Sequence, residues 1–368
     1  MVYDACSYFQ LQKYLNMHKE LRSKTIGYTP VDLDFSTAGD KRRFVYYANQ
    51  LGLNWEPCQL DKNYDILYIT TIANMSNWIN YKKSHPKTVL IFDINNSFFF
   101  NQNFWWNLAR GFSRFISRRE SKFYFNYNDV YHEMFKYADI VVCPTESAKE
   151  YISQFNPKVY IPFDFFEEDI TIKKSKYIND RPLVVVWEGM GVTAKHLLTI
   201  APVFEKFQGK ILLKIVSDRS YKYGLLTVDV PKIFKGLQCD YEFIDWEKDS
   251  FSKHIVESDL AIIPLDKSDK VALHKPENKL ILFWQHGIPV ITTDTPAYVK
   301  AFSEVDYNLT CGNLKEWEKK LELFISGKFD SRQHMDSVNN YLQKYRSREE
   351  FMMAWDRIFK EALKMGRS

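Results

Sequence analysis

The chain has 368 residues, of which 45% are hydrophobic and 26% are charged, and its formal net charge is +4. This is the balance of a globular protein, and the length suits two domains of roughly 150 to 180 residues each. With only 13 glycines and 13 prolines, the composition excludes collagen-like and disordered chains, and the weak charge argues against a dedicated nucleic-acid binder.

The cysteines and the first residues bear on the compartment. The five cysteines lack CxxC spacing, which fits a reducing cytosol better than a disulfide framework or a zinc site. They are Cys6, Cys58, Cys143, Cys239 and Cys311. Residues 1–15 carry no signal-peptide pattern, and no run reaches the roughly 18 apolar residues of a membrane-spanning helix. The sequence predicts a cytoplasmic protein, or one that lies peripherally at the inner face of a membrane.

Short apolar runs rich in Val, Ile, Leu and Tyr alternate with helical stretches along most of the chain. Runs that are apolar at consecutive positions belong to parallel sheets that helices cover on both faces. The predicted strands form two sets, which are residues 31–35, 65–71, 88–94, 138–145 and 158–163, and residues 183–189, 210–218, 239–246, 260–266 and 289–293.

The two sets of strands predict the domain organisation. Residues 164–182, charged and without clear periodicity, separate them and are the best linker candidate. The sequence therefore predicts an α/β fold with two Rossmann-like domains facing across a cleft. We expect an N-terminal domain over residues 1–165 and a C-terminal domain over 183–345. Residues 346–368 should form a final helix.

The first loop with candidate chemistry is STAGDKRRF, residues 36–44, behind the first predicted strand. Asp40 offers a carboxylate, and Arg42 and Arg43 offer guanidinium groups that seek phosphate or carboxylate. The alternative is that Asp40 caps the helix that starts here while both arginines lie in water. The residue types leave both interpretations open.

A second polar cluster follows a predicted buried strand. In FDINNSFFF, residues 92–100, the strand ends at Asp93, with Asn95 and Asn96 behind it. Asp and Asn also shape turns, because their short side chains bind nearby backbone groups. This cluster fits either a substrate contact or a simple turn.

The helix over residues 104–123 mixes aromatic residues with four arginines and a lysine. Wide aromatic side chains on one side and basic ones on another suit a helix that lies on an anionic bilayer. The alternatives are a core-packing helix with a solvated basic face and an acceptor-binding helix. The sequence leaves these three open.

The segment WEGMG begins the second domain, and a helix carrying Lys195 follows it. Gly189 and Gly191 let the backbone approach a diphosphate, which the helix N-terminus and the lysine can neutralise. Two glycines can also simply shape a turn. Glu188 fits a donor contact or a solvated loop.

The stretch KPENKLILFWQHGIPVITT, residues 275–293, predicts a helix that begins near Pro276 and a turn at Gly287 that leads into a strand. Proline is favoured in the first turn of a helix. The stretch follows the predicted strand 260–266, which ends at Asp266. In open parallel α/β sheets, ligands bind beyond the carboxyl ends of the strands.

Charged residues stand at the start of this helix. Its first turn offers free backbone N–H groups and the positive end of the helix dipole, which together bind anions. Lys275 and Lys279 add positive charge, and Glu277 adds a carboxylate that can accept sugar hydroxyls. In the alternative interpretation, Glu277 only complements the dipole and both lysines are solvated.

Residues 257–301 resemble the donor-binding segment of GT-B glycosyltransferases, and among them the large retaining family of bacterial sugar transferases that build lipopolysaccharide and capsule. In that family a strand like LAIIPL precedes a loop, a helix opened by a Lys-Leu pair (here Lys279 and Leu280) and a Gly-x-Pro-Val turn. Residues 187–207 are similar to the first strand, loop and helix of the family's C-terminal domain, and residues 138–155 to the end of its N-terminal domain.

The sequence departs from that family at two positions. The family usually places a glutamate five residues before the turn glycine, and a partner glutamate eight residues earlier. This chain has Leu282 and His274 at those positions, so the paired-glutamate motif is absent. Glu277 is the nearest carboxylate that can take over a hydroxyl contact.

The resemblance implies roles for the candidate residues. It places Asp93 and Asp40 near the transferred sugar as catalytic carboxylates, and it places four residues towards the acceptor, namely Arg42, Arg43, Asn95 and Asn96. The donor side comprises Glu188, Gly189, Gly191, Lys195, Asp266, His274, Lys275, Glu277, Asn278, Lys279 and Leu280. It further implies that the final helix returns to the N-terminal domain and that no bound metal ion is needed.

The leading hypothesis is a metal-independent, retaining glycosyltransferase for cell-surface polysaccharide. A nucleotide-sugar would serve as co-substrate without another cofactor, and the acceptor would be a saccharide or a lipid-linked glycan. Peripheral membrane contact through residues 104–123 would suit a lipid-linked acceptor, and nucleic acid is not an expected partner. The alternative is a catalytically silent GT-B-like protein that binds a glycan or a partner protein.

Overall fold

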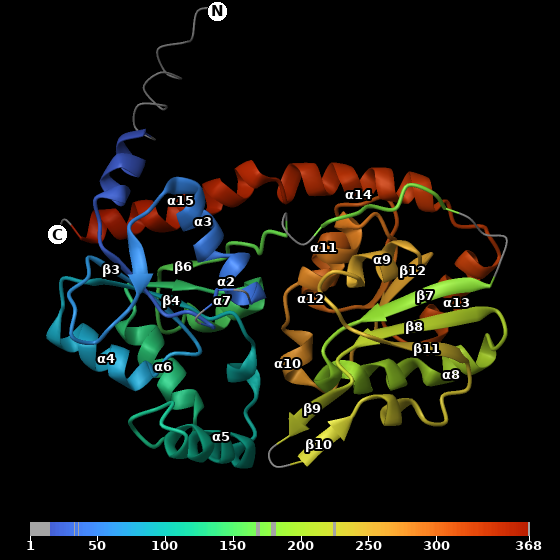
Figure 1. The fold of residues 1–368 in the computed structure, drawn as a ribbon, viewed down its shortest axis with the longest axis horizontal. Helices are drawn as coiled ribbons and strands as arrows, with labels where there is room; N and C mark the ends of the chain where they lie inside the picture. Colours follow the sequence, from blue (N-terminus) through green and yellow to red (C-terminus); the bar gives the residue numbers. More distant parts are fainter. Residues whose placement is uncertain are drawn as a thin grey trace, which may run out of the picture. The chain divides into compact units, whose positions relative to one another are not determined.

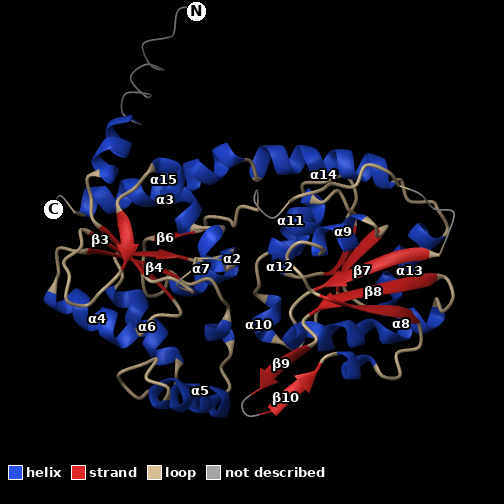
Figure 2. Ribbon diagram, in the orientation of Figure 1, coloured by secondary structure: helices blue, strands red, loops and turns tan. Residues whose placement is uncertain are grey.

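The computed structural model describes residues 15–366, except 33, 36, 167–169, 178–181 and 224–225. The chain divides into two compact units, the first formed by Met1–Phe165 with Arg348–Ser368 and the second by Phe166–Ser347. Each unit has a parallel sheet flanked by helices (Figure 2). The predicted α/β class is therefore confirmed.

The sheet of the first unit has the strand order β2-β1-β3-β4-β5-β6, and all of its pairings are parallel. Its strands are β1 Ile26–Tyr28, β2 Trp55–Pro57, β3 Ile66–Thr70, β4 Val89–Asp93, β5 Ile140–Val142 and β6 Val159–Tyr160. The helices are α2 Ala38–Lys41, α3 Phe44–Leu51, α4 Met75–Ser84, η1 Phe98–Phe100, α5 Phe104–Ile116, α6 Asn128–Tyr137, α7 Glu146–Ile152 and α15 Arg348–Met365.

Aromatic rings join the final helix to the core of the first unit. Phe44 of α3 stacks on Tyr68 of β3 with ring centroids 4.6 Å apart, and Tyr47 stacks on Phe359 of α15 at 5.2 Å. Figure 1 shows α15, in red, alongside α3. Burial of such large rings dominates the energy of a core, so α15 is part of this unit, as the resemblance implied.

The sheet of the second unit has the order β11-β8-β7-β12-β13-β14, again all parallel. Its strands are β7 Leu183–Glu188, β8 Ile211–Ser217, β11 Asp240–Asp245, β12 Leu260–Ile263, β13 Val290–Thr293 and β14 Thr310–Cys311, and an antiparallel hairpin joins β9 Ser220–Tyr223 to β10 Leu226–Asp229. The helices are η3 Gly191–Ile200, α8 Ala201–Lys206, η4 Pro231–Phe234, α9 Phe251–Val256, α10 Lys270–Leu273, α11 Asn278–Gln285, α12 Pro296–Phe302, α13 Leu314–Ile325 and α14 Ser331–Tyr345.

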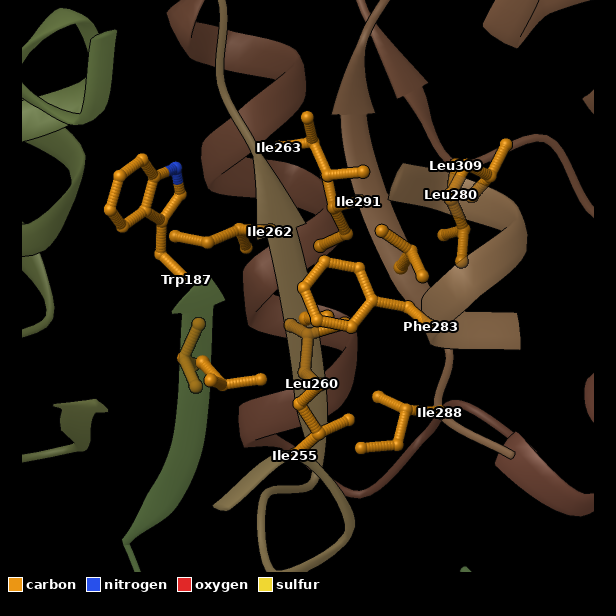
Figure 3. Packing of buried hydrophobic residues seen from close by; sticks show 14 of the residues in the cluster. Trp187, Ile255, Leu260, Ile262, Ile263, Leu280, Phe283, Ile288, Ile291 and Leu309 are labelled. Atoms are coloured by element: carbon orange, nitrogen blue, oxygen red, sulfur yellow. The ribbon is translucent and has the colours of Figure 1, made fainter. Parts of the chain in front are cut away.

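The apolar part of α11 anchors that helix to its sheet. Figure 3 shows Phe283 pointing towards Leu260 of β12 and Ile291 of β13, and all three side chains are buried. Leu280 is also fully buried. At roughly 1.5 to 3 kcal/mol for each large apolar side chain buried, these contacts hold the start of the helix in place relative to the strand ends.

The predicted linker is largely part of the second unit. The backbone N–H of Lys174 donates to the carbonyl of His286 at 2.8 Å, and the Tyr177 hydroxyl donates to the carbonyl of Gly287 at 2.8 Å. The Lys174 ammonium also lies 3.7 Å from the Asp259 carboxylate. The lack of periodicity in this segment predicted a linker. In the structure, Lys174 and Tyr177 instead hydrogen-bond to the turn between α11 and β13.

The predicted strand over residues 31–35 is wrong. The backbone N–H groups of Val31 and Asp32 donate to the Asp40 carboxylate instead of to a strand. The first strand is β1, a three-residue stretch too short to show a period. Among the described residues, no helix is long and apolar enough to cross a membrane.

Candidate functional site

The start of α11 differs in detail from the prediction. The helix begins at Asn278 with Glu277 as its N-cap, so Pro276 precedes the helix instead of opening it. The short helix α10 comes just before, because the Asp269 carboxylate accepts the backbone N–H groups of Val271 and Ala272 at 3.0 and 3.1 Å. Cap hydrogen bonds of this kind stabilise a helix start, and they fix the loop that leads to α11.

Lys279 connects the start of α11 to the end of β7. Its ammonium donates to the backbone carbonyl of Glu188, lies 4.0 Å from the Glu188 carboxylate and lies 5.1 Å from the centroid of the Trp187 ring. A Cβ at Gly189 would lie 2.4 Å from that ammonium. Only glycine at position 189 leaves room for the Lys279 ammonium. The two segments that the sequence predicted as donor-binding therefore contact each other at this point.

The two lysines at this position each have one carboxylate nearby, yet burial outweighs it. Burial lowers the pKa of Lys275, although Asp269 opposes this shift, and burial together with the charge of Lys275 lowers the pKa of Lys279, although Glu188 opposes it. A lowered lysine pKa means that the site disfavours the bare cation relative to water. An anion bound between the two ammonium groups would relieve that cost, so the arrangement favours a negatively charged ligand.

Glu277 has a partner that the sequence did not reveal. Its carboxylate forms an ion pair with Arg346, the C-cap residue that follows α14, and Arg346 also donates to the Tyr341 hydroxyl at 3.3 Å. Arg346 binds one of the two Glu277 oxygens, so the ion pair leaves acceptor positions on this carboxylate. The donor contact of Glu277 stays a prediction.

The Gly191 loop is occupied by a carboxylate. The backbone N–H of Gly191 donates to Asp218 at 3.2 Å, and a Cβ at this position would lie 2.5 Å from Val230. Gly191 is the first of the ten residues of the 3₁₀ helix η3, which is the predicted helix that carries Lys195. A diphosphate that used this N–H group would have to displace Asp218, which also carries a negative charge.

Lys195 is exposed on η3, while its neighbour His196 is buried. His196 Nδ1 accepts the backbone N–H of Asp266 at 3.1 Å, and its Nε2 lies 3.7 Å from the Asp269 carboxylate. Burial lowers the pKa of His196, which keeps the ring neutral and able to accept at Nδ1. His196 therefore joins η3 to the loop behind β12, a role that sequence reasoning missed.

The remaining donor-side residues divide by burial. Asp266 is partly exposed and accepts the Ser268 hydroxyl at 2.7 Å, which lowers the pKa of Asp266. His274 and Asn278 are partly exposed, and burial and Lys270 lower the pKa of His274. The side chain of Leu280 lies in the core, so only its backbone can face a ligand.

In the first unit, Asp93 belongs to a buried ion-pair network. Arg43 donates to both of its carboxylate oxygens at 2.8 Å and to Asp164 at 2.7 Å, and the Tyr68 hydroxyl donates to Asp93 at 2.7 Å. Arg43 and Asp93 are each only 2% exposed. Arg43 does not lie in water, so that alternative is wrong, and an acceptor contact by Arg43 stays a prediction that would require its ion pairs to open.

Asp40 is fully buried and accepts hydrogen bonds from four groups of its own unit. Besides the two N–H groups of residues 31 and 32, it binds the Thr37 hydroxyl at 2.8 Å and the Tyr28 hydroxyl. It therefore holds the loop behind β1. Asp40 lies within α2, and α3 has Arg43 as its N-cap without a side-chain hydrogen bond, so Asp40 does not cap α3. A catalytic role for Asp40 or Asp93 stays a prediction that requires these bonds to open.

The other acceptor-side residues lie at strand ends of the first sheet. Thr71 donates to Asn95 at 3.1 Å and accepts from Asn96 at 3.0 Å, and Asn96 also accepts the N–H of Phe98 at 3.1 Å. This is the turn that the residue types indicated. Asn95, Asn96 and Arg42 remain partly exposed, so a substrate contact remains open to them.

Potential metal ligands do not gather in the described part of the chain. Across residues 15–366 without the gaps given above, no three His, Cys, Asp or Glu side chains come together as a metal ion would require. Metal independence stays a prediction.

The structure is similar to solved glycosyltransferases of the GT-B fold. HepE from Anabaena in complex with UDP is 12% identical, with a TM-score of 0.57 over 95% of this chain and 94% of that one. The lipopolysaccharide outer core galactosyltransferase WaaB is 13% identical, with a TM-score of 0.55 over 89% and 82%.

TarM from S. aureus is 14% identical, with a TM-score of 0.56 over 86% of this chain, which spans only 57% of TarM. No family model and no curated protein matches the sequence. At these identities the likeness shows the fold alone, and the predicted GT-B fold is confirmed.

Proposed function

We propose that this protein is a glycosyltransferase that transfers a sugar from a nucleotide-sugar to a saccharide or lipid-linked glycan of the cell surface. The observation that carries the proposal is the contact between Lys279 of α11 and the carbonyl of Glu188 at the end of β7. It unites two predicted donor-binding segments at the carboxyl edge of one sheet. HepE, which shares the fold, has been solved with UDP-glucose, and this supports a donor of that class.

The proposed chemistry is electrostatic. When the bond between sugar and diphosphate breaks, negative charge grows on the leaving diphosphate. Lys279 and Lys275 would bind that charge together with the backbone N–H groups at the start of α11. Because these cations are already in place, they need not reorganise during the reaction. Such stabilisation requires no bound metal ion, and it is the same for a retaining enzyme as for an inverting one; we propose retention from the family resemblance.

The first unit would receive the acceptor. Arg42, Asn95 and Asn96 keep partly exposed polar groups there, and guanidinium and amide groups bind sugar hydroxyls and phosphates. A lipid-linked acceptor would place the protein at the inner face of a membrane.

Release of nucleotide tests the proposal. The full-length protein would be incubated with a panel of nucleotide-sugars, first without acceptor and then with candidate saccharides and lipid-linked saccharides. We expect slow release of the nucleotide from one donor, faster release with the right acceptor, and a matching glycoside product. Failure of every donor to release nucleotide, although one of them binds, would contradict the transferase and support a silent protein.

One observation favours that alternative, a GT-B-like protein that binds a glycan or a partner without catalysis. Leu282, which stands where the family has its glutamate, is only 7% exposed and packs in the core. It cannot hold a ribose through hydrogen bonds. A Leu282→Glu variant would bury a charge and is expected to destabilise the unit, so the alternative is better tested by the nucleotide-release assay.

A further inference from the structure

Helix α5 has its polar face turned inward and its apolar face turned outward. The inner face carries Asn107 and Gly111, the two buried residues of the helix. On the outer face, Trp105 is 73% exposed, Phe112 is 58% exposed and Ile116 is 64% exposed. A helix on a globular protein normally buries its apolar stripe, so this orientation needs a physical cause.

Gly111 and Asn107 form the part of the inner face where α5 lies closest to neighbouring backbone. A Cβ on Gly111 would lie 2.1 Å from the carbonyl oxygen of Tyr124, so only glycine permits this approach. The Asn107 amide donates to the carbonyls of Asn101 and Asn103 at 2.8 and 3.1 Å. These contacts fix the rotation of α5 about its axis.

Two arginines complete the inner face. Arg110 donates to the Tyr131 hydroxyl at 2.9 Å, and its guanidinium lies 4.3 Å from the centroid of the Phe98 ring and 4.9 Å from that of the Tyr127 ring. Arg114 lies 3.6 Å from the buried Glu120 carboxylate. Because arginine stacks on aromatic rings and binds carboxylates, these side chains hold the polar face against the protein.

Because these contacts hold the polar side of α5 against the protein, the side that faces outward is apolar. Phe104 and Phe115 extend it, and Phe125, which is 70% exposed, lies in the segment that follows the helix. Figure 1 shows α5, in teal, set apart from the sheet of its unit. Clustered large apolar side chains of this kind mark a site that binds an apolar partner.

Charge decides the nature of that partner. Between Asp93 and Glu120 the sequence has four arginines and no acidic residue. Two of these arginines, Arg118 and Arg119, are exposed just beyond the end of α5. Aromatic and aliphatic side chains beside exposed arginines match a bilayer with anionic headgroups, where each group finds its preferred depth.

We infer that the outer face of α5 binds the surface of an anionic lipid bilayer, with Trp105, Phe112 and Ile116 in the interface and Arg118 and Arg119 at the headgroups. This inference replaces the core-packing interpretation of residues 104–123, because the side chains expected in the core are the exposed ones. It goes beyond the transferase proposal and does not rest on it, because vesicle binding is measured without donor or acceptor.

Vesicle sedimentation with the full-length protein tests the inference. We expect binding to vesicles of equal parts phosphatidylglycerol and phosphatidylcholine, and much weaker binding to phosphatidylcholine alone. Trp105→Glu with Ile116→Glu should weaken binding by at least about tenfold. Arg118→Gln with Arg119→Gln should weaken it by about 30-fold on anionic vesicles only, at ~1 kcal/mol for each charge.

The matched control is Leu226→Glu with Met353→Glu, which changes two side chains that are 70% and 42% exposed elsewhere. This variant should bind vesicles like the wild type, and all variants should keep the wild-type melting temperature because each altered side chain is exposed. The inference is overturned if the wild type does not sediment with anionic vesicles, or if the control loses binding equally. It is also overturned if the Trp105 and Ile116 changes only dissociate a lipid-free oligomer and leave vesicle binding intact.

Discussion

Charged residues follow the strand ends of both sheets, but their surroundings differ. In the first unit, Asp93 and Arg43 are buried and satisfy each other with two hydrogen bonds of 2.8 Å. In the second unit, Lys275 and Lys279 are partly exposed, and the nearest carboxylate to the Lys279 ammonium, that of Glu188, is 4.0 Å away. Charges that are buried and hydrogen-bonded to each other indicate a structural role, whereas cations that stay partly exposed beyond a strand end indicate a ligand site.

The largest effect tests the structural side of this comparison. Arg43→Ala would leave Asp93 and Asp164 buried without their cation, and loss of one partner of a buried pair costs about 3 to 5 kcal/mol. We expect the free energy of unfolding, measured with denaturant, to fall by that amount. Lys122→Ala, which removes an exposed pair with Glu133, serves as the control and should change it by less than about 1 kcal/mol. Equal effects of the two variants would break the comparison.

A smaller effect is expected on donor affinity at the second unit. Asp218 accepts the Gly191 N–H that we expect a diphosphate to use, so Asp218→Asn removes a like charge from the site. Donor affinity should rise by about fivefold, which corresponds to ~1 kcal/mol for charges separated by water. The control Asp229→Asn, in the nearby hairpin, should have no effect. Unaltered or weaker binding by Asp218→Asn in calorimetry would place the diphosphate away from Gly191.

The pH dependence gives the smallest effect. Because burial lowers the pKa of Lys275 and Lys279, donor affinity should decline with rising pH, and the decline should begin at a lower pH than ordinary lysines would give. Lys275→Arg should reduce this decline, since arginine stays charged. The sign is opposite for stability. Between the lowered folded pKa and the ordinary unfolded pKa the unfolded chain binds more protons, so the free energy of unfolding rises with pH there. A donor affinity that falls only at the pH where ordinary lysines lose their proton would contradict a lowered pKa of the lysines at the site.

Much of the fold followed from local sequence. Runs of consecutive apolar residues predicted nine of the strands, since such runs need burial on both faces. The short strands β1, β2 and β14 and the β9–β10 hairpin were missed, because short or exposed strands leave no clear period. The false strand at residues 31–35 shows the limit of the method, because a distant carboxylate, Asp40, decides where that backbone donates.

The candidate site was predictable only in part. The sequence indicated Lys279 and Gly189 separately, but not that the ammonium occupies the space above the glycine. Arg346, Asp218 and His196 were missed because each acts through a partner far away in the chain. The orientation of α5 was also out of reach, because its pattern of aromatics and arginines fits either face inward until Gly111 fixes it.

Calorimetric titration of nucleotide-sugars, beginning with UDP-sugars, tests the central claim most directly. The wild type should bind one donor, and Lys279→Ala should weaken that binding by at least tenfold, because a cation that contacts a diphosphate contributes about 1.5 to 3 kcal/mol. Lys232→Ala, which removes an exposed lysine paired with Asp229, should bind like the wild type. Absence of binding by the wild type, or binding by Lys279→Ala equal to that of the wild type, would contradict an anion site at the start of α11.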